Sequence, residues 1–121
     1  MNESYIANIQ WGIVQSILSS DEKIKINLLL YSISFIKVMI NDKDSIEVVE
    51  DLEKKLYDIL KTCNFKIYDN YIKNIYVIDD NVNQDIQKIH ENIIQIDKIR
   101  SKILEICIKN KIDIVALSQP F

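Results

Sequence analysis

One glycine, Gly12, and one proline, Pro120, occur in this chain of 121 residues. Tight turns and β-hairpins usually need these residue types, because glycine accepts positive φ and proline presets φ. Helices joined by short linkers of Asn, Asp and Ser need neither. The shortage of both residues therefore favours an all-α fold over a sheet.

The length is that of one ordinary domain, so we expect a single helical-bundle domain over residues 1–121. Hydrophobic residues make up 48% of the chain, which is enough apolar surface to form a core. The many isoleucines, lysines and asparagines and the single arginine, Arg100, are typical of a low-GC genome. Bacteria, phages and large viruses with such genomes are the expected sources.

Three features favour a cytoplasmic protein with no membrane partner. The first residues lack the basic region of a secretory signal. The longest apolar run, 26–36, is interrupted by polar residues and is far shorter than the roughly 20 residues that span a bilayer. Cys63 and Cys107 fall at positions of apolar periodicity, which favours buried, reduced thiols over a disulfide.

The first half of the chain contains two predicted helices. Ser4 can cap a first helix, whose apolar stripe is formed by Ile6, Ile9, Ile13 and Ile17 and widened by Tyr5, Val14 and Leu18. Ser19 or Ser20 can cap a second helix that runs to about Ile40. Its apolar residues surround most of the axis, so we expect it to be the most buried element; they are Ile24, Leu28, Leu29, Leu30, Ile33, Phe35, Ile36, Met39 and Ile40.

A third helix follows a polar linker over 41–44. Asp44 and Glu47 have the spacing of a capping box. The apolar seam has heptad-like spacing and comprises Val49, Leu52, Leu56, Ile59 and Cys63. Acidic residues stand four positions before lysines on the other side, in the pairs Glu50 with Lys54 and Asp51 with Lys55. This pattern predicts a solvated helix that packs one stripe inward.

The longest predicted helix starts at a cap on Asn81 or Asn83 and ends near Asn110. Its heptad seam is Val82, Ile86, Ile89, Ile93, Ile96, Arg100, Ile103 and Cys107. A buried guanidinium needs a carboxylate partner, so Arg100 is the exception in this seam. It can fix the helix register, pair across a dimer, or mark where the seam rotates toward Ile99, Ile103 and Ile106.

Two segments leave alternatives open. A short hairpin near residues 65–77 and a helix over about 68–78 both fit the sequence, and we favour the helix. The apolar tail, residues 113–121, is expected to dock on the bundle, with a groove on a partner as the alternative. The predicted fold is therefore an all-α, four- to five-helix bundle with a long C-terminal helix.

The sequence predicts no catalytic, metal or cofactor site. Oxygen ligands alternate as in a calcium-binding loop at Asp79, Asn81, Asn83 and Asp85. However, Gln84 stands where the loop needs glycine, and His90 stands where a bidentate glutamate should close the site. With one histidine and one glycine, the chain offers neither a two-histidine zinc site nor a glycine-rich phosphate loop. We therefore expect a protein that is not an enzyme.

Two groups of residues are candidates for binding a partner. Tyrosines are enriched at the energetic centres of protein interfaces, which suggests a role for Tyr68, Tyr71 and Tyr76. The last predicted helix carries a basic group able to contact phosphates or an acidic protein: Lys98, Arg100, Lys102 and Lys109. Lysines there also complement the helix dipole without any partner.

The predicted function is a non-enzymatic protein-binding module that occludes or tethers a partner protein. Inhibitors, immunity-type proteins, anti-defence proteins and adaptors belong to this class. The first alternative is a structural, homodimeric subunit that assembles through the long helix. Nucleic-acid binding through the basic face is the least favoured, since the net charge is −3.

Overall fold

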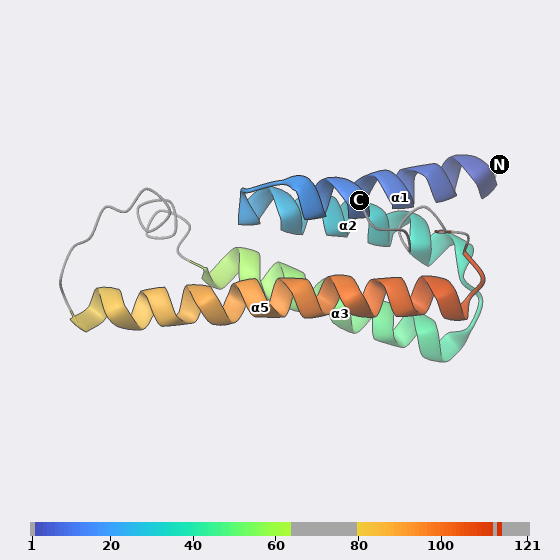
Figure 1. The fold of residues 1–121 in the computed structure, drawn as a ribbon. Coiled ribbons are helices and arrows are strands. Elements are labelled where there is room, and N and C mark those ends of the chain that lie inside the picture. The colour runs from blue at the N-terminus through green and yellow to red at the C-terminus, as the bar shows by residue number, and fades with distance from the viewer. Residues whose placement is uncertain (1, 64–79, 113, 115–121) are drawn as a thin grey trace.

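The computed structural model describes residues 2–63, 80–112 and 114, which form four helices and no strand (Figure 1). The helices are α1 (Asn2–Leu18), α2 (Glu22–Met39), α3 (Lys43–Thr62) and α5 (Asp80–Lys109). The predicted all-α bundle with a long C-terminal helix is thereby confirmed. The hairpin or helix expected within 64–79 lies outside the described residues, as do residues 115–121 of the tail.

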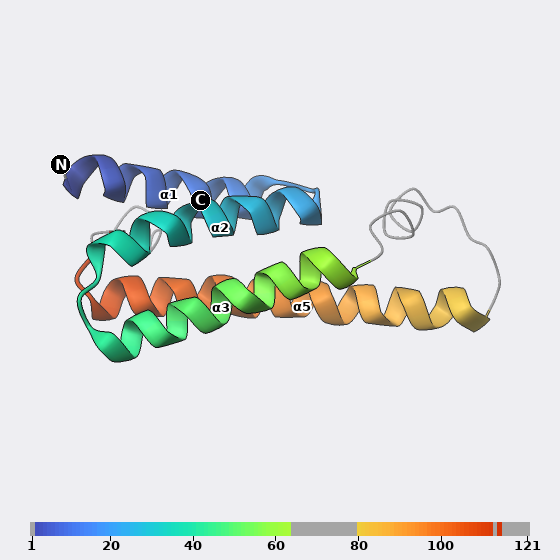
Figure 2. The same ribbon diagram turned by 180° about the vertical axis from the view of Figure 1, so that it is seen from behind.

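The four helices form two layers. Helices α1 and α2 make an antiparallel hairpin that lies over α3 and α5, as both side views show (Figures 1 and 2). Helix α2 contacts the other three helices. Helix α5 has 30 residues, so it is about 45 Å long and extends past the end of the hairpin (Figure 1). The core between the layers is built mainly from isoleucine and leucine side chains of all four helices.

Aspartates cap the second and third helices, and both caps differ from the predicted ones. The Asp21 carboxylate accepts a hydrogen bond from the Ile24 N–H, while the hydroxyl of Ser19 accepts one from the Asp21 N–H. The Asp42 carboxylate accepts from the Ser45 N–H, so α3 begins before the predicted cap at Asp44. A carboxylate at this position satisfies an otherwise unpaired N–H and also complements the helix dipole.

The hairpin is held by unusually close contact between α1 and α2 at Gly12. A Cβ atom at this position would collide with the Ser32 hydroxyl and lie 2.9 Å from the Leu28 carbonyl oxygen. Ser32 is fully buried there, and its hydroxyl donates to the Ile9 carbonyl oxygen at 3.0 Å. The single glycine of the chain therefore serves helix packing rather than a turn.

This packing corrects two sequence predictions. Ile17 and Leu18 of the predicted α1 stripe are exposed, because the small residues Gly12 and Ser16 face inward in their place. Helix α2 is central, as expected, but it is not buried on all sides. Its outer side, which includes Ile24, faces away from the core.

Helix α5 follows its predicted seam, and near Arg100 the buried side of the helix rotates toward Ile99 and Ile106. Ile89, Ile96, Ile103 and Cys107 are buried, and Ile99 and Ile106 join them on either side of a half-buried Arg100. The helix begins at Asp80, so Asn81 and Asn83 lie within its first turn rather than at its cap.

The end of α5 is a left-handed turn. Lys111 has φ of 58°, the Ile112 N–H donates to the Cys107 carbonyl oxygen, and the Lys111 N–H donates to that of Ile108. This is a Schellman motif with lysine where glycine is usual. It returns the chain to the bundle, where Ile112 and Ile114 are buried, so the tail docks at least as far as Ile114.

Candidate functional site

The predicted basic residues of α5 do not form one surface. Lys98 and Lys102 are exposed and line an open depression of about 400 Å³ together with Ile94, Asp97, Ser101 and Glu105. Lys102 also lies 3.7 Å from the Glu105 carboxylate. Acidic groups therefore interrupt the positive charge on this side of the helix.

Lys109, at the end of α5, points toward the start of α3 and links the two helices there. Its ammonium group lies 3.2 Å from the Asp42 carboxylate, which also accepts a hydrogen bond of 2.6 Å from the Ser45 hydroxyl. The Asn110 amide donates to that same hydroxyl at 3.1 Å. The bond from Ser45, followed by the one from Lys109, lowers the pKa of Asp42. The network fixes the start of α3 against the end of α5.

Arg100 points toward α1. Its guanidinium contacts the hydroxyl and the carbonyl oxygen of Ser16, and it pairs with Asp97 one turn earlier on α5. The predicted carboxylate partner is thus present on the same helix. Among the basic candidates, only Lys98 and Lys102 share an exposed face, and Tyr68, Tyr71 and Tyr76 lie outside the described residues.

A polar cluster forms where α2 begins and α3 ends. Glu22 is buried and accepts a hydrogen bond from the Lys25 ammonium group at 2.9 Å. Burial raises the pKa of the nearby Cys63 thiol. The hydrogen bond with Asn92 and then the charge of Lys88 oppose this rise in the pKa, and the Glu22 charge adds the smallest contribution to it. Cys63 is half-buried rather than buried, and both Cys63 and Cys107 are free thiols. The described residues bring no three metal-ligating side chains together.

The outer side of the hairpin carries a different kind of surface. On α1, residues spaced alternately three and four apart form a row of Ser4, Ala7, Trp11, Val14 and Leu18. On α2, the same spacing gives a row of Ile24, Leu28, Tyr31, Phe35 and Val38. We call these two rows together the hairpin face. Such spacing is that of a coiled-coil seam, but here the large exposed side chains of both rows lie on the outer side of the hairpin. Phe35 is partly buried and also packs against the core.

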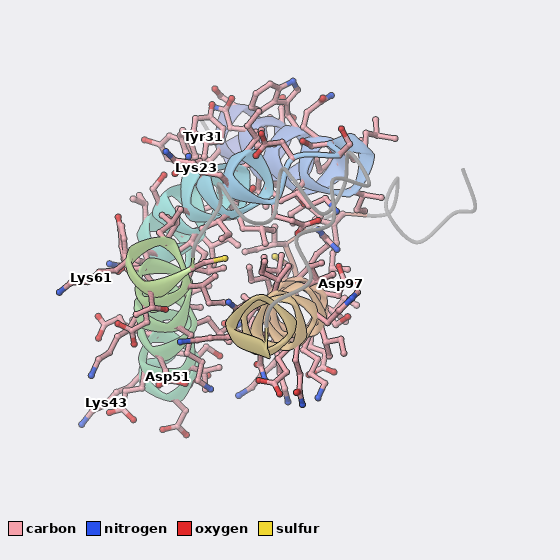
Figure 3. All side chains as sticks on the ribbon, turned by 90° about the vertical axis from the view of Figure 1, so that its left-hand side faces the viewer. Lys23, Tyr31, Lys43, Asp51, Lys61 and Asp97 are labelled. Atoms are coloured by element: carbon pink, nitrogen blue, oxygen red, sulfur yellow. The ribbon has the colours of Figure 1, made fainter. Side chains whose placement is uncertain are left out.

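Large apolar side chains of the hairpin face are exposed. The exposed fractions are 52% for Trp11, 66% for Leu18, 50% for Ile24, 38% for Tyr31 and 65% for Val38. Figure 3, which views the bundle along its axis, shows Tyr31 on the side of the hairpin opposite α3 and α5. These side chains therefore remain available for contact with another molecule.

Aromatic packing connects the two rows. The Trp11 and Tyr31 rings meet edge to face with centroids 5.5 Å apart, and the Tyr31 and Phe35 rings do so at 5.1 Å. The Tyr31 hydroxyl donates to the Asn8 side-chain oxygen at 3.0 Å. The aromatic centre of the face is thus held in one arrangement before any partner binds.

The hairpin face contains no charged residue, in a chain of which 27% is charged. Segments 4–18 and 26–36 have no Asp, Glu, Lys or Arg. Lys25 and Lys37 are turned away from the face, because they pair with Glu22 and Glu53. Exposed Lys23, next to Ile24 in the sequence, borders the face. Contact along the two rows themselves would require no charge to lose its water.

Sequence reasoning missed this surface although its signal was present. Both helices have two apolar rows, and the predicted core stripes include Val14, Leu18, Ile24, Leu28 and Phe35 of the hairpin face. Trp11, Tyr31 and Val38 belong to no predicted stripe. Small residues distinguish the inner row from the outer row. Gly12, Ser16 and Ser32 lie where the helices touch, which leaves Trp11 and Tyr31 on the outside.

No known protein family, curated protein or solved structure gives a significant match to this chain. None of the helices in the described ranges has the length and hydropathy needed to cross a membrane.

Proposed function

We propose that this protein is a non-enzymatic module that binds another protein through the hairpin face. The observation that carries the proposal is the exposed, uncharged pair of apolar rows with Trp11 and Tyr31 at its centre. An exposed apolar patch of this kind on a folded domain typically marks a protein interface.

The chemistry of the face suits tight binding. Tryptophan and tyrosine are the residues most enriched at the energetic centres of interfaces. The rings of Trp11, Tyr31 and Phe35 already pack on one another, so binding would lose little side-chain entropy. A partner that offers an apolar helix could pack its ridge along the two rows.

Occlusion or tethering is the mode of action that this surface supports best. Helix-on-helix packing would cover the partner's own apolar helix, as an inhibitor, immunity-type, anti-defence or adaptor protein does. The proposal includes a cytoplasmic location, which the free thiols of Cys63 and Cys107 support.

Capture experiments with matched variants test the proposal. Wild-type protein, Trp11→Ala, Tyr31→Ala and the control Tyr57→Ala would be immobilised and exposed to an extract of the cells that make the protein. Tyr57 is an exposed tyrosine of α3, away from the hairpin face. Circular dichroism would establish that each variant is folded.

We expect the wild type and Tyr57→Ala to retain the same protein and both hairpin variants to lose at least 90% of it. Retention by all four proteins would contradict the proposal. So would a loss caused by Lys98→Ala with Lys102→Ala and not by Trp11→Ala, since the α5 face would then be the binding surface.

A further inference from the structure

We infer that, in the free protein, a second copy of this chain occupies the hairpin face, with α2 packed antiparallel on α2 of that copy. The inference rests on the proposed function, because it names an occupant of the same surface. The second copy and the partner protein would then compete for it.

The spacing on α2 is symmetric about Tyr31. Ile24 lies seven residues before Tyr31 and Val38 lies seven residues after it. A two-fold axis through Tyr31, in the plane of the interface, therefore brings Ile24 opposite Val38 of the second copy. The two Tyr31 rings meet at the axis, and each Trp11 lies beside them on α1. One apolar row thus complements itself, as a two-fold interface requires.

The charge pattern also permits self-association. Each copy has a net charge of −3, and two like-charged surfaces would repel each other. None of the ten residues of the hairpin face is charged, and segments 4–18 and 26–36 are uncharged; Lys23, Lys25 and Lys37 flank the ends of the α2 row. A second copy therefore offers two opposing rows that are uncharged, largely apolar and matched in length.

The area is sufficient for a dimer. The five exposed large apolar side chains of the face expose the equivalent of between two and three whole side chains, which is roughly 500 Å². Two copies would therefore bury on the order of 1,000 Å² in total from these side chains alone, which is at the lower end of the range for specific protein interfaces.

Sedimentation velocity on the full chain over a range of concentrations tests the inference, with Val38→Glu and the control Ile94→Glu. Both residues are exposed, so neither change should affect folding, but Ile94 lies on the outer side of α5. We expect a dimer for the wild type and for Ile94→Glu. Val38→Glu should raise the dissociation constant at least roughly 100-fold, because each dimer would bury two carboxylates.

A disulfide between copies tests the axis itself. In a Cys63→Ser background, Tyr31→Cys places a thiol at the proposed axis, and mild oxidation should give a covalent dimer. Tyr57→Cys on α3 is the matched control and should form no covalent dimer under the same conditions.

A wild type that is monomeric at every concentration would overturn the inference, while the capture experiment would still decide the proposed function. A dimer that Ile94→Glu dissociates and Val38→Glu does not would also overturn it, because α5 would then be the interface. Absence of the Tyr31→Cys disulfide in a dimer would exclude the proposed axis.

Discussion

Arg100 of α5 holds the end of α1 through two groups of Ser16. Its Nη2 donates to the Ser16 carbonyl oxygen at 3.0 Å, and its Nε donates to the Ser16 hydroxyl at 3.0 Å. Carbonyl groups in the last turn of a helix have no partner within the helix, so this one would otherwise be buried and unpaired. Asp97, whose carboxylate lies 2.7 Å from Nη1, balances the charge.

Replacing Arg100 should destabilise the fold. Arg100→Met keeps much of the side-chain volume but leaves the buried Ser16 carbonyl oxygen unpaired, while the Ser16 hydroxyl still donates to the Ile13 carbonyl oxygen at 2.6 Å. We therefore expect the free energy of unfolding to fall by about 1–3 kcal/mol. Arg100→Lys should restore little, because an ammonium group cannot bridge the two acceptors in the same way. Urea unfolding measures the change, with exposed Lys102→Met as control; equal stability of both variants would refute the role of Arg100.

Gly12→Ala should destabilise the hairpin, although alanine is the better helix former by about 1 kcal/mol. The added methyl group would lie 2.9 Å from the Leu28 carbonyl oxygen, which is backbone and can move only with α2 itself. Forcing the helices apart should outweigh the gain, for a net loss of about 1–3 kcal/mol by thermal unfolding. An increase in stability would show that α1 and α2 do not pack this closely.

The network at Asp42 predicts an acid dependence of stability. The pKa of Asp42 lies below its ordinary value of 3.8, chiefly because the Ser45 hydroxyl hydrogen-bonds to the carboxylate. A carboxyl group whose pKa is lower in the folded state stabilises the fold above its unfolded pKa and loses this effect as the pH falls through the folded pKa.

Thermal unfolding between neutral pH and pH 3 should therefore show a smaller loss of stability on acidification for Asp42→Asn than for the wild type. Ser45→Ala should also reduce the loss, since it removes the main cause of the lowered pKa. Identical acid dependence in all three proteins would show that this network does not couple to folding.

The two thiols should differ in reactivity. Burial raises the pKa of the Cys107 thiol to about 12. Cys63 is only half-buried and its thiol pKa is also raised, but a reagent reaches its sulfur more easily. Only the thiolate reacts readily, so a thiol reagent at pH 8 should label Cys63 first and Cys107 only when the bundle opens. Mass spectrometry of the labelled protein, native and in denaturant, checks this order, and rapid native labelling of Cys107 would contradict its burial.

The fold was largely predictable because its signals are local. The spacing of apolar residues predicted α3 and the seam of α5, where Val49, Leu56 and Ile103 are buried as expected. The exposed Asp51 and Lys55 form the ion pair that their spacing predicted, at 3.1 Å. Helix starts were less predictable, because several Ser, Asp and Asn residues near each start compete as caps.

The candidate surface was less predictable for a physical reason. An apolar residue at helical spacing indicates a face, but not whether that face meets the core or another molecule. The position of α2 against α1 decides this for Tyr31, and it depends on contacts between Gly12 and Ser32, which are 20 residues apart. Likewise, the partner of Arg100 on α1 is 84 residues away in sequence, beyond any local pattern.

Fluorescence of Trp11, the single tryptophan of the chain, measures directly whether the hairpin face is the binding surface. The indole is 52% exposed in the isolated chain. When the captured partner is added to dilute protein, we expect emission at shorter wavelength and weaker quenching by iodide, because the ring becomes buried. Binding that leaves both the emission and the quenching unchanged would contradict it.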